Sequence, residues 1–134
     1  MESNVDPGNT NSGAVVLAHV NGFNSGDAAA AVAMFADTAV FVTGQRVVQG
    51  KATLREFFGE SMSALRPVLL PSTPLVLRDD VEGDRVAVEI VEEIIDEATT
   101  HRFSIAGFYR VIDGLIVSAK IYREGSSDWP PPQS

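Results

Sequence analysis

Five carboxylates interrupt an otherwise apolar stretch at residues 86–101, VAVEIVEEIIDEATTH. They are Glu89, Glu92, Glu93, Asp96 and Glu97. Because successive side chains of a strand point to opposite faces, Glu92 shares the more apolar face with Val88 and Ile90. Burial among such side chains disfavours the charged form of a carboxylate, so Glu92 is the candidate general acid or base. Alternatively, a bulge at Glu92 and Glu93 would leave both acids solvated.

His19 is the second candidate for acid–base chemistry. It recurs with Val16, Val20 and Phe23 at the spacing of one helix face. An imidazole on this face could hold Glu92 through a hydrogen bond or act as a base itself. The alternatives are a core histidine bonded to a backbone carbonyl, or a histidine at the rim of a pocket.

Aromatic side chains supply the remaining candidates. Tyr109 could donate a phenolic hydrogen bond, although a tyrosine on a sheet more often packs with its hydroxyl at the surface. His101 shares the strand face of Tyr109 but lies at the start of its strand, where exposure is expected. Four phenylalanines are expected to form the core and the apolar wall of a ligand cavity: Phe41, Phe57, Phe58 and Phe103.

The composition excludes several classes of partner and cofactor. The 134 residues carry a formal net charge of −8, so nucleic-acid backbones and anionic membranes are not expected partners. With no cysteine and only two histidines, which are 82 positions apart, no metal site is expected, and no glycine-rich phosphate loop indicates a cofactor. The first residues lack the features of a signal peptide, and we expect a cytoplasmic protein.

The elements that would position these residues follow from periodicity. Residues 1–12 and 125–134 are predicted to be flexible tails around one domain, residues 13–124. Two short helices open the domain, the second one running through Val32, Phe35 and Ala36. A strand at 39–43, an extended piece at 47–48 and a third helix bearing Leu54 and Phe58 follow.

The second half of the domain is predicted to consist of strands. They span residues 75–77, 86–95, 102–112 and 115–123, with turns at 82–84 and at Asp113 and Gly114. In the last strand, alternation places Leu115, Val117, Ala119 and Ile121 on the inner face. Helices followed by strands indicate an α+β fold, in which helices cover one face of a mostly antiparallel sheet.

The outer face of these strands is too apolar for a surface that faces only water. The apolar residues predicted there are Val91, Ala106, Phe108, Ile112, Ile116 and Tyr122. Charged residues of both signs share this face, namely Arg102, Arg110, Lys120, Glu89 and Glu93. We therefore predict a homodimer through the outer sheet face.

Three stretches carry a resemblance to a known family: FNSGDAAAAVAMFADTAVF, VVQGKATLREFF and FSIAGFYRVIDGLIVSAKIYRE. They resemble the SnoaL-like branch of the nuclear transport factor 2-like superfamily, and the resemblance covers about residues 14–124. The resemblance implies a cone-shaped, curved sheet whose concave face is covered by three helices and encloses an apolar pocket.

The resemblance also implies where the catalytic residues of the superfamily's enzymes would lie in this chain. A ketosteroid isomerase would need catalytic groups where this chain has Thr43, Gly107 and His19, so all three positions are substituted. The acid, arginine and second acid of an epoxide hydrolase would fall on Glu92, Ile90 and Ile121, and its water-holding pair on Phe41 and Thr43. Only Glu92 retains an acid there.

These observations predict a domain that binds a small, largely hydrophobic molecule. Cofactor-free acid–base chemistry of the isomerase, epoxide hydrolase or polyketide cyclase type would use Glu92 as acid or base and His19 as its partner. The ligand-binding residues would be Thr43, Phe41, Phe57, Phe58, Phe103, Tyr109 and Ile121. The alternatives are a non-catalytic ligand-binding or dimerisation module and an adaptor that binds proteins through its sheet.

Overall fold

The computed structural model describes residues 11–79 and 83–123 of the chain. Helix α1, Asn11–Asn24, buries Val16, Val20 and Phe23 on one face, as their spacing predicts. Helix α2, Ala28–Val32, begins where the carboxylate of Asp27 accepts a hydrogen bond of 2.9 Å from the backbone of Ala29.

The prediction that α2 continues through Phe35 and Ala36 is wrong. Both residues belong to strand β1, Phe35–Thr43, in which Phe35 pairs with Ile116 of a strand far along the chain. Phe35 is almost completely buried there. Its pairing and burial are tertiary interactions, and they override the helical spacing of the local sequence.

Helix α3, Lys51–Leu65, follows the short strand β2, Arg46–Gln49, and buries Leu54 and Phe58. It ends at Arg66, which adopts the left-handed conformation with φ 47°. Pro67 follows and cannot continue a helix. The chain then turns directly into the sheet.

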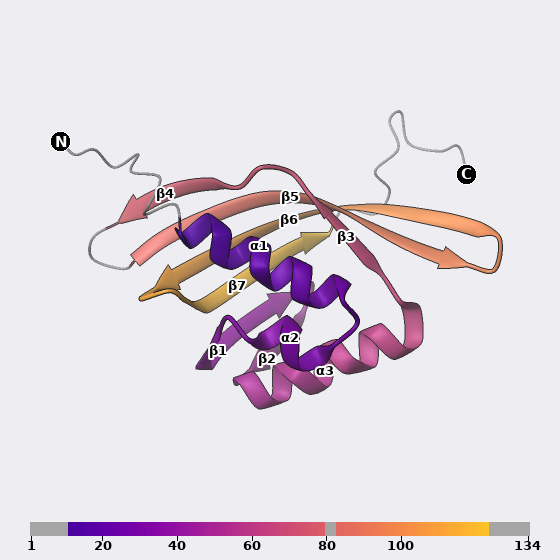
Figure 1. The fold of residues 1–134 in the computed structure, drawn as a ribbon, viewed down its shortest axis with the longest axis horizontal. Coiled ribbons are helices and arrows are strands. Elements are labelled where there is room, and N and C mark those ends of the chain that lie inside the picture. Colours follow the sequence, from indigo (N-terminus) through magenta and orange to yellow (C-terminus); the bar gives the residue numbers. More distant parts are fainter. Residues whose placement is uncertain (1–10, 80–82, 124–134) are drawn as a thin grey trace.

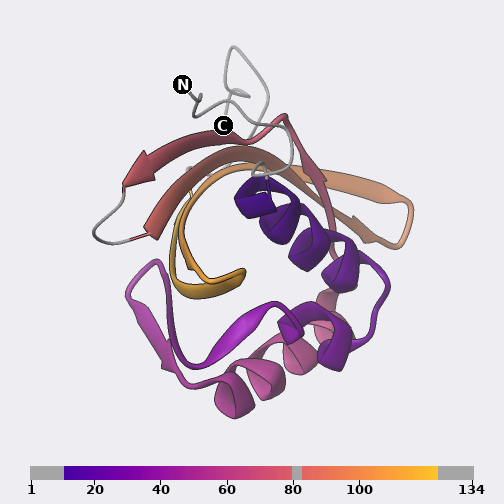
Figure 2. The same cartoon turned by 60° about the vertical axis from the view of Figure 1, so that its left-hand side comes forward.

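The sheet contains seven strands in the order β2, β1, β7, β6, β5 and β3, with β4 also pairing with β5. The later strands are β3 (Val68–Pro71), β4 (Leu75–Asp79), β5 (Gly83–Asp96), β6 (Thr99–Ile112) and β7 (Leu115–Arg123). All neighbours are antiparallel except β1 and β7. The sheet curls around α1, and α2 and α3 lie across its open side (Figures 1 and 2). This architecture confirms the predicted α+β fold.

A bulge between β6 and β7 corrects the predicted inner face of β7. Val111 pairs with Ile116 but Arg110 pairs with Ser118, which leaves Val117 as the extra residue. Ile116 is therefore fully buried in the core, although alternation predicted it on the outer face. Leu115 is exposed instead, whereas Ala119 and Ile121, beyond the bulge, face inward as predicted.

The ends of the predicted segments differ in detail. Helix α1 begins at Asn11, inside the predicted N-terminal tail, and the hydroxyl of Ser12 donates a 2.6 Å hydrogen bond to Asp84. The rest of that tail and residues 125–134 lie outside the described part of the chain. Of the predicted turn at 82–84, Gly83 and Asp84 belong to β5, and Glu82 is not described. Neither α1 nor any other described helix is long and apolar enough to cross a membrane.

Candidate functional site

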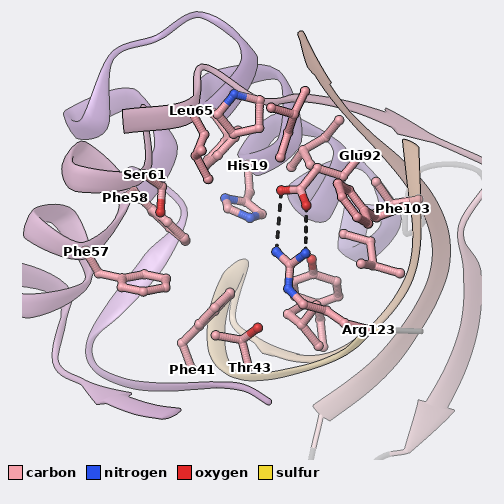
Figure 3. Close-up of a pocket in the computed structure, with 18 residues that line it drawn as sticks. His19, Phe41, Thr43, Phe57, Phe58, Ser61, Leu65, Glu92, Phe103 and Arg123 are labelled. Carbon is pink, nitrogen blue, oxygen red and sulfur yellow. Dashed lines mark hydrogen bonds and ion pairs between the residues drawn. The ribbon is translucent and has the colours of Figure 1, made fainter. Parts of the chain in front are cut away.

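A cavity of about 400 Å³ lies between the concave face of the sheet and the helices α1 and α3. The nine residues that the sequence predicts for the site all line it: His19, Phe41, Thr43, Phe57, Phe58, Glu92, Phe103, Tyr109 and Ile121. His19 comes from α1, the two adjacent phenylalanines from α3, and the other six from β1, β5, β6 and β7. The curl of the sheet therefore brings together residues that are far apart in the sequence (Figure 3).

Most of the wall is apolar, and its aromatic rings pack against one another. The rings of Phe41 and Phe58 meet edge to face with centroids 5.3 Å apart, and Phe57 lies 5.8 Å from Phe58. Contacts of this kind hold large apolar surfaces in a defined position. The cavity is consequently suited to an apolar ligand, with polar groups restricted to a few points.

Glu92 is buried, with 6% of its surface exposed, and it faces the cavity as alternation predicts. It is not an isolated acid. Arg123 Nη1 donates a hydrogen bond of 2.6 Å to Glu92 Oε1, and Nη2 lies 3.4 Å from Oε2 (Figure 3). This two-point contact fixes the orientation of the carboxylate. The side chain of Arg123 is 46% exposed, so its outer part reaches solvent.

Arg123 is the charged residue of the cavity wall that sequence reasoning missed. Alternation did contain a signal, because Arg123 lies two positions after Ile121 and therefore shares its inward face. The pairing registers complete the explanation. Glu92 pairs with Phe103, while Arg123 pairs with Ile105, the next inward residue of the same strand. The two charged residues are thus diagonal neighbours across β6.

His19 does not hold Glu92. Its Nδ1 lies 2.8 Å from the carbonyl oxygen of Ala31, and the residue as a whole is 3% exposed. A carbonyl oxygen can only accept, so Nδ1 carries the proton and Nε2 of the neutral ring is an acceptor. Burial lowers the pKa of His19 to about 4, against a smaller opposing effect of the Ala31 hydrogen bond. The imidazole is therefore neutral at pH 7.

Tyr109 lies near His19, with ring centroids 6.1 Å apart, and is 3% exposed. Burial raises the pKa of its hydroxyl, which therefore stays protonated and able to donate. Tyr109 therefore faces the cavity, and the alternative that its hydroxyl lies at the surface does not hold. His101 is exposed and does not line the cavity, as its position near the strand start predicts.

Besides the hydroxyls of Thr43 and Ser61, the cavity offers two pairs of polar groups. Glu92 and Arg123 form a charge pair that can exchange or stabilise a proton next to a ligand, and His19 and Tyr109 form a neutral acceptor and donor. Within residues 11–79 and 83–123, no group of three or more histidine, aspartate or glutamate side chains is arranged to hold a metal ion.

Comparison with protein families gives a match over most of the domain. The family described as SnoaL-like domain matches residues 16–119. No curated protein matches the sequence significantly.

Solved structures share the fold at low sequence identity. The epoxide hydrolase/cyclase-like enzyme SalBIII, which has a role in pyran ring formation in salinomycin, is 21% identical with a TM-score of 0.71, covering 90% of this chain and 98% of its own. An LEH-like epoxide hydrolase from M. tuberculosis is 19% identical with a TM-score of 0.69, covering 88% and 86%. A putative polyketide cyclase from Xanthomonas campestris is 24% identical with a TM-score of 0.71, covering 86% and 91%.

Proposed function

Because the chain belongs to the SnoaL-like domain family of the nuclear transport factor 2-like superfamily, we propose that its cavity binds a small, largely hydrophobic molecule and promotes cofactor-free acid–base chemistry on it. The reaction would be of the isomerase, epoxide hydrolase or polyketide cyclase type. The solved structures with this fold include proteins described as enzymes of the last two classes.

One observation carries this proposal. A buried carboxylate, Glu92, faces an aromatic cavity and is held in a fixed orientation by Arg123. A carboxylate that accepts hydrogen bonds on one side can take a proton from a ligand on the other, and the nearby guanidinium can stabilise negative charge that develops on the ligand. We assign Glu92 the role of base and Arg123 that of its orienting partner.

A non-catalytic ligand-binding module is the second candidate. Ile121 stands where an epoxide hydrolase of this superfamily would have its second acid, and Arg123 already neutralises Glu92. In that case the pocket would bind its ligand without changing it, and the charge pair would serve only to orient the ligand.

An experiment with matched variants separates the two candidates. The wild type would be incubated with a hydroxylated cyclic alkene epoxide, a hydroxylated β,γ-unsaturated cyclic ketone and a linear β-keto ester, which has an enol form, and turnover would be followed by NMR. Glu92→Gln should lower turnover of the accepted substrate at least about 100-fold. Glu93→Gln is the control, because Glu93 lies on the outer face and pairs with Arg102 at 2.8 Å.

Binding is measured in the same variants by displacement of an apolar fluorescent dye. If Glu92→Gln turns over as fast as the wild type, the proposed role of Glu92 is wrong. If the wild type binds these molecules and converts none of them, the non-catalytic module is the better description.

We also propose that two copies pair through the outer face of the sheet. Phe108 and Tyr122 are about half exposed there, and their rings meet edge to face at 5.6 Å. Leu75 and Leu77 of β4 are also largely exposed and line a shallow groove beside Phe108. A second copy would cover this apolar surface. The acidic side chains on the outer face of each copy would then pair with the basic side chains of the other. The cytoplasmic location remains a prediction from the sequence.

A further inference from the structure

The polar atoms of the cavity wall that have no partner among the described residues include one on His19 and one on Tyr109. His19 Nδ1 is bonded to Ala31, but Nε2 has no hydrogen-bond partner there. The hydroxyl of Tyr109 likewise has none. In the described part of the chain, every fully buried side-chain oxygen or nitrogen has a hydrogen-bond partner. His19 Nε2 and the Tyr109 hydroxyl have none, so both atoms are accessible from the cavity. Both residues line the cavity, so their unused hydrogen bonds are available to a ligand.

The geometry determines what His19 can recognise. Its ring is held by Ala31 on one side, by the edge of Phe35 at 4.9 Å and by the stacked ring of Phe58 at 5.5 Å. The ring therefore has no room to turn over, and the proton stays on Nδ1 while the bond to Ala31 lasts. Nε2 presents a lone pair, which attracts a donor and repels the oxygen of a ketone or an ether.

The position of Tyr109 depends on Gly107, which has no side chain. A Cβ atom on Gly107 would lie 2.6 Å from Cε1 of Tyr109 and 2.9 Å from its hydroxyl oxygen. Tyr109 thus folds back along β6 over Gly107 and occupies the space that a side chain at position 107 would take. Its hydroxyl remains on the cavity side of the sheet as a protonated phenol.

We propose that this pair of groups recognises a hydroxyl group on the ligand. The ligand hydroxyl donates its proton to His19 Nε2 and its oxygen accepts a hydrogen bond from the Tyr109 hydroxyl. The ligand is therefore a neutral, hydrophobic alcohol, phenol or enol whose hydroxyl enters the cavity and whose apolar body rests against Phe41 and Phe58. This inference rests on the proposed function, because it names the substrate class of the same cavity.

Three probes of nearly equal size test the inference by calorimetric titration. They are 1-indanol, which donates and accepts, 1-indanone, which only accepts, and indane, which does neither. The wild type should bind 1-indanol about tenfold more tightly than 1-indanone, since the ketone leaves Nε2 facing an acceptor. Tyr109→Phe should lower the affinity for 1-indanol severalfold and leave that for indane unchanged.

His19 is tested by spectroscopy on the wild type, because substitution of this buried residue endangers folding. In ¹⁵N NMR spectra of the wild type, His19 should show a protonated Nδ1 and an unprotonated Nε2, and 1-indanol should shift the Nε2 signal while indane should not. Equal affinity for the three probes, tighter binding of the ketone, or a proton on Nε2 would each overturn the inference and leave the proposed function standing. Failure of all three probes to bind would overturn both.

Discussion

Tyr109 lies over Gly107 on the concave face of β6, so close that a Cβ atom at position 107 would be 2.6 Å from the tyrosine ring. The absence of a side chain at one position therefore determines the place of a hydroxyl two positions later. Because Tyr109 lines the cavity, a change at Gly107 acts on the cavity through Tyr109.

Gly107→Ala should push the ring of Tyr109 toward the cavity. The added methyl cannot be accommodated without this movement, and we expect the free energy of unfolding to fall by about 1–2 kcal/mol. Gly59→Ala in α3 is the control, because a Cβ atom there would meet only Ala28, at 3.7 Å. That variant should be unchanged or up to about 1 kcal/mol more stable. Urea unfolding followed by circular dichroism measures both, and equal stability of the two variants would contradict the prediction.

Removing the charge of Arg123 should lower the free energy of unfolding more than removing the charge of Glu92. Arg123→Met leaves a buried carboxylate without its partner, and we expect it to lower the free energy of unfolding by about 2 kcal/mol. Glu92→Gln leaves a cation that is 46% exposed and can be hydrated, so the loss should stay below about 1 kcal/mol. The double variant should recover most of the stability lost in Arg123→Met. Equal losses in the two single variants would show that the burial of the carboxylate has no such effect.

The pKa of His19 predicts a loss of stability in mild acid. In the unfolded chain its pKa is near 6.5, whereas burial lowers it to about 4 in the folded protein. Between these values the unfolded state binds more protons, so the stability contributed by the neutral ring is complete above pH 6.5 and is lost as the pH falls toward 4. Between pH 7.5 and pH 5 the loss should be about 2 kcal/mol.

Substitution separates the contribution of His19 to the pH dependence from that of the other titratable groups. His19→Gln cannot titrate and should show a correspondingly weaker dependence on pH than the wild type in urea unfolding. His101→Gln removes the other histidine, which is exposed on β6, and controls for the loss of a histidine as such. If His19→Gln and the wild type lose stability in parallel, the ring of His19 is not buried in its neutral form.

Phe108→Glu should convert the proposed dimer into a monomer. Burying a new carboxylate at the centre of an apolar contact is unfavourable, and we expect the dissociation constant to rise at least about thirtyfold. Light scattering at micromolar concentration measures the change. Val47→Glu is the control, because Val47 is an exposed apolar residue on the edge strand β2, away from Phe108. A monomeric wild type would refute the dimer and leave the outer face to another partner.

Much of this molecule could be read from local periodicity. Helical spacing in α1 and the alternation in β5 placed His19 and Glu92 on their inward faces, because the core removes one face of each element from water whatever its neighbours are. The α+β arrangement followed from the order of helices and strands. The resemblance to a family predicted the curvature of the sheet, which encloses the cavity.

Only the tertiary structure decided which side chains contact one another and where a bulge changes the alternation of a strand. Local alternation could not show that Arg123 meets Glu92, since that contact depends on the registers of three strands. Nor could it show that Ala31 fixes the tautomer of His19, or that a bulge at Val117 turns Ile116 inward. Periodicity reports the face that a residue occupies, whereas its partner depends on how distant segments align, and that alignment is determined by the packing of the whole chain.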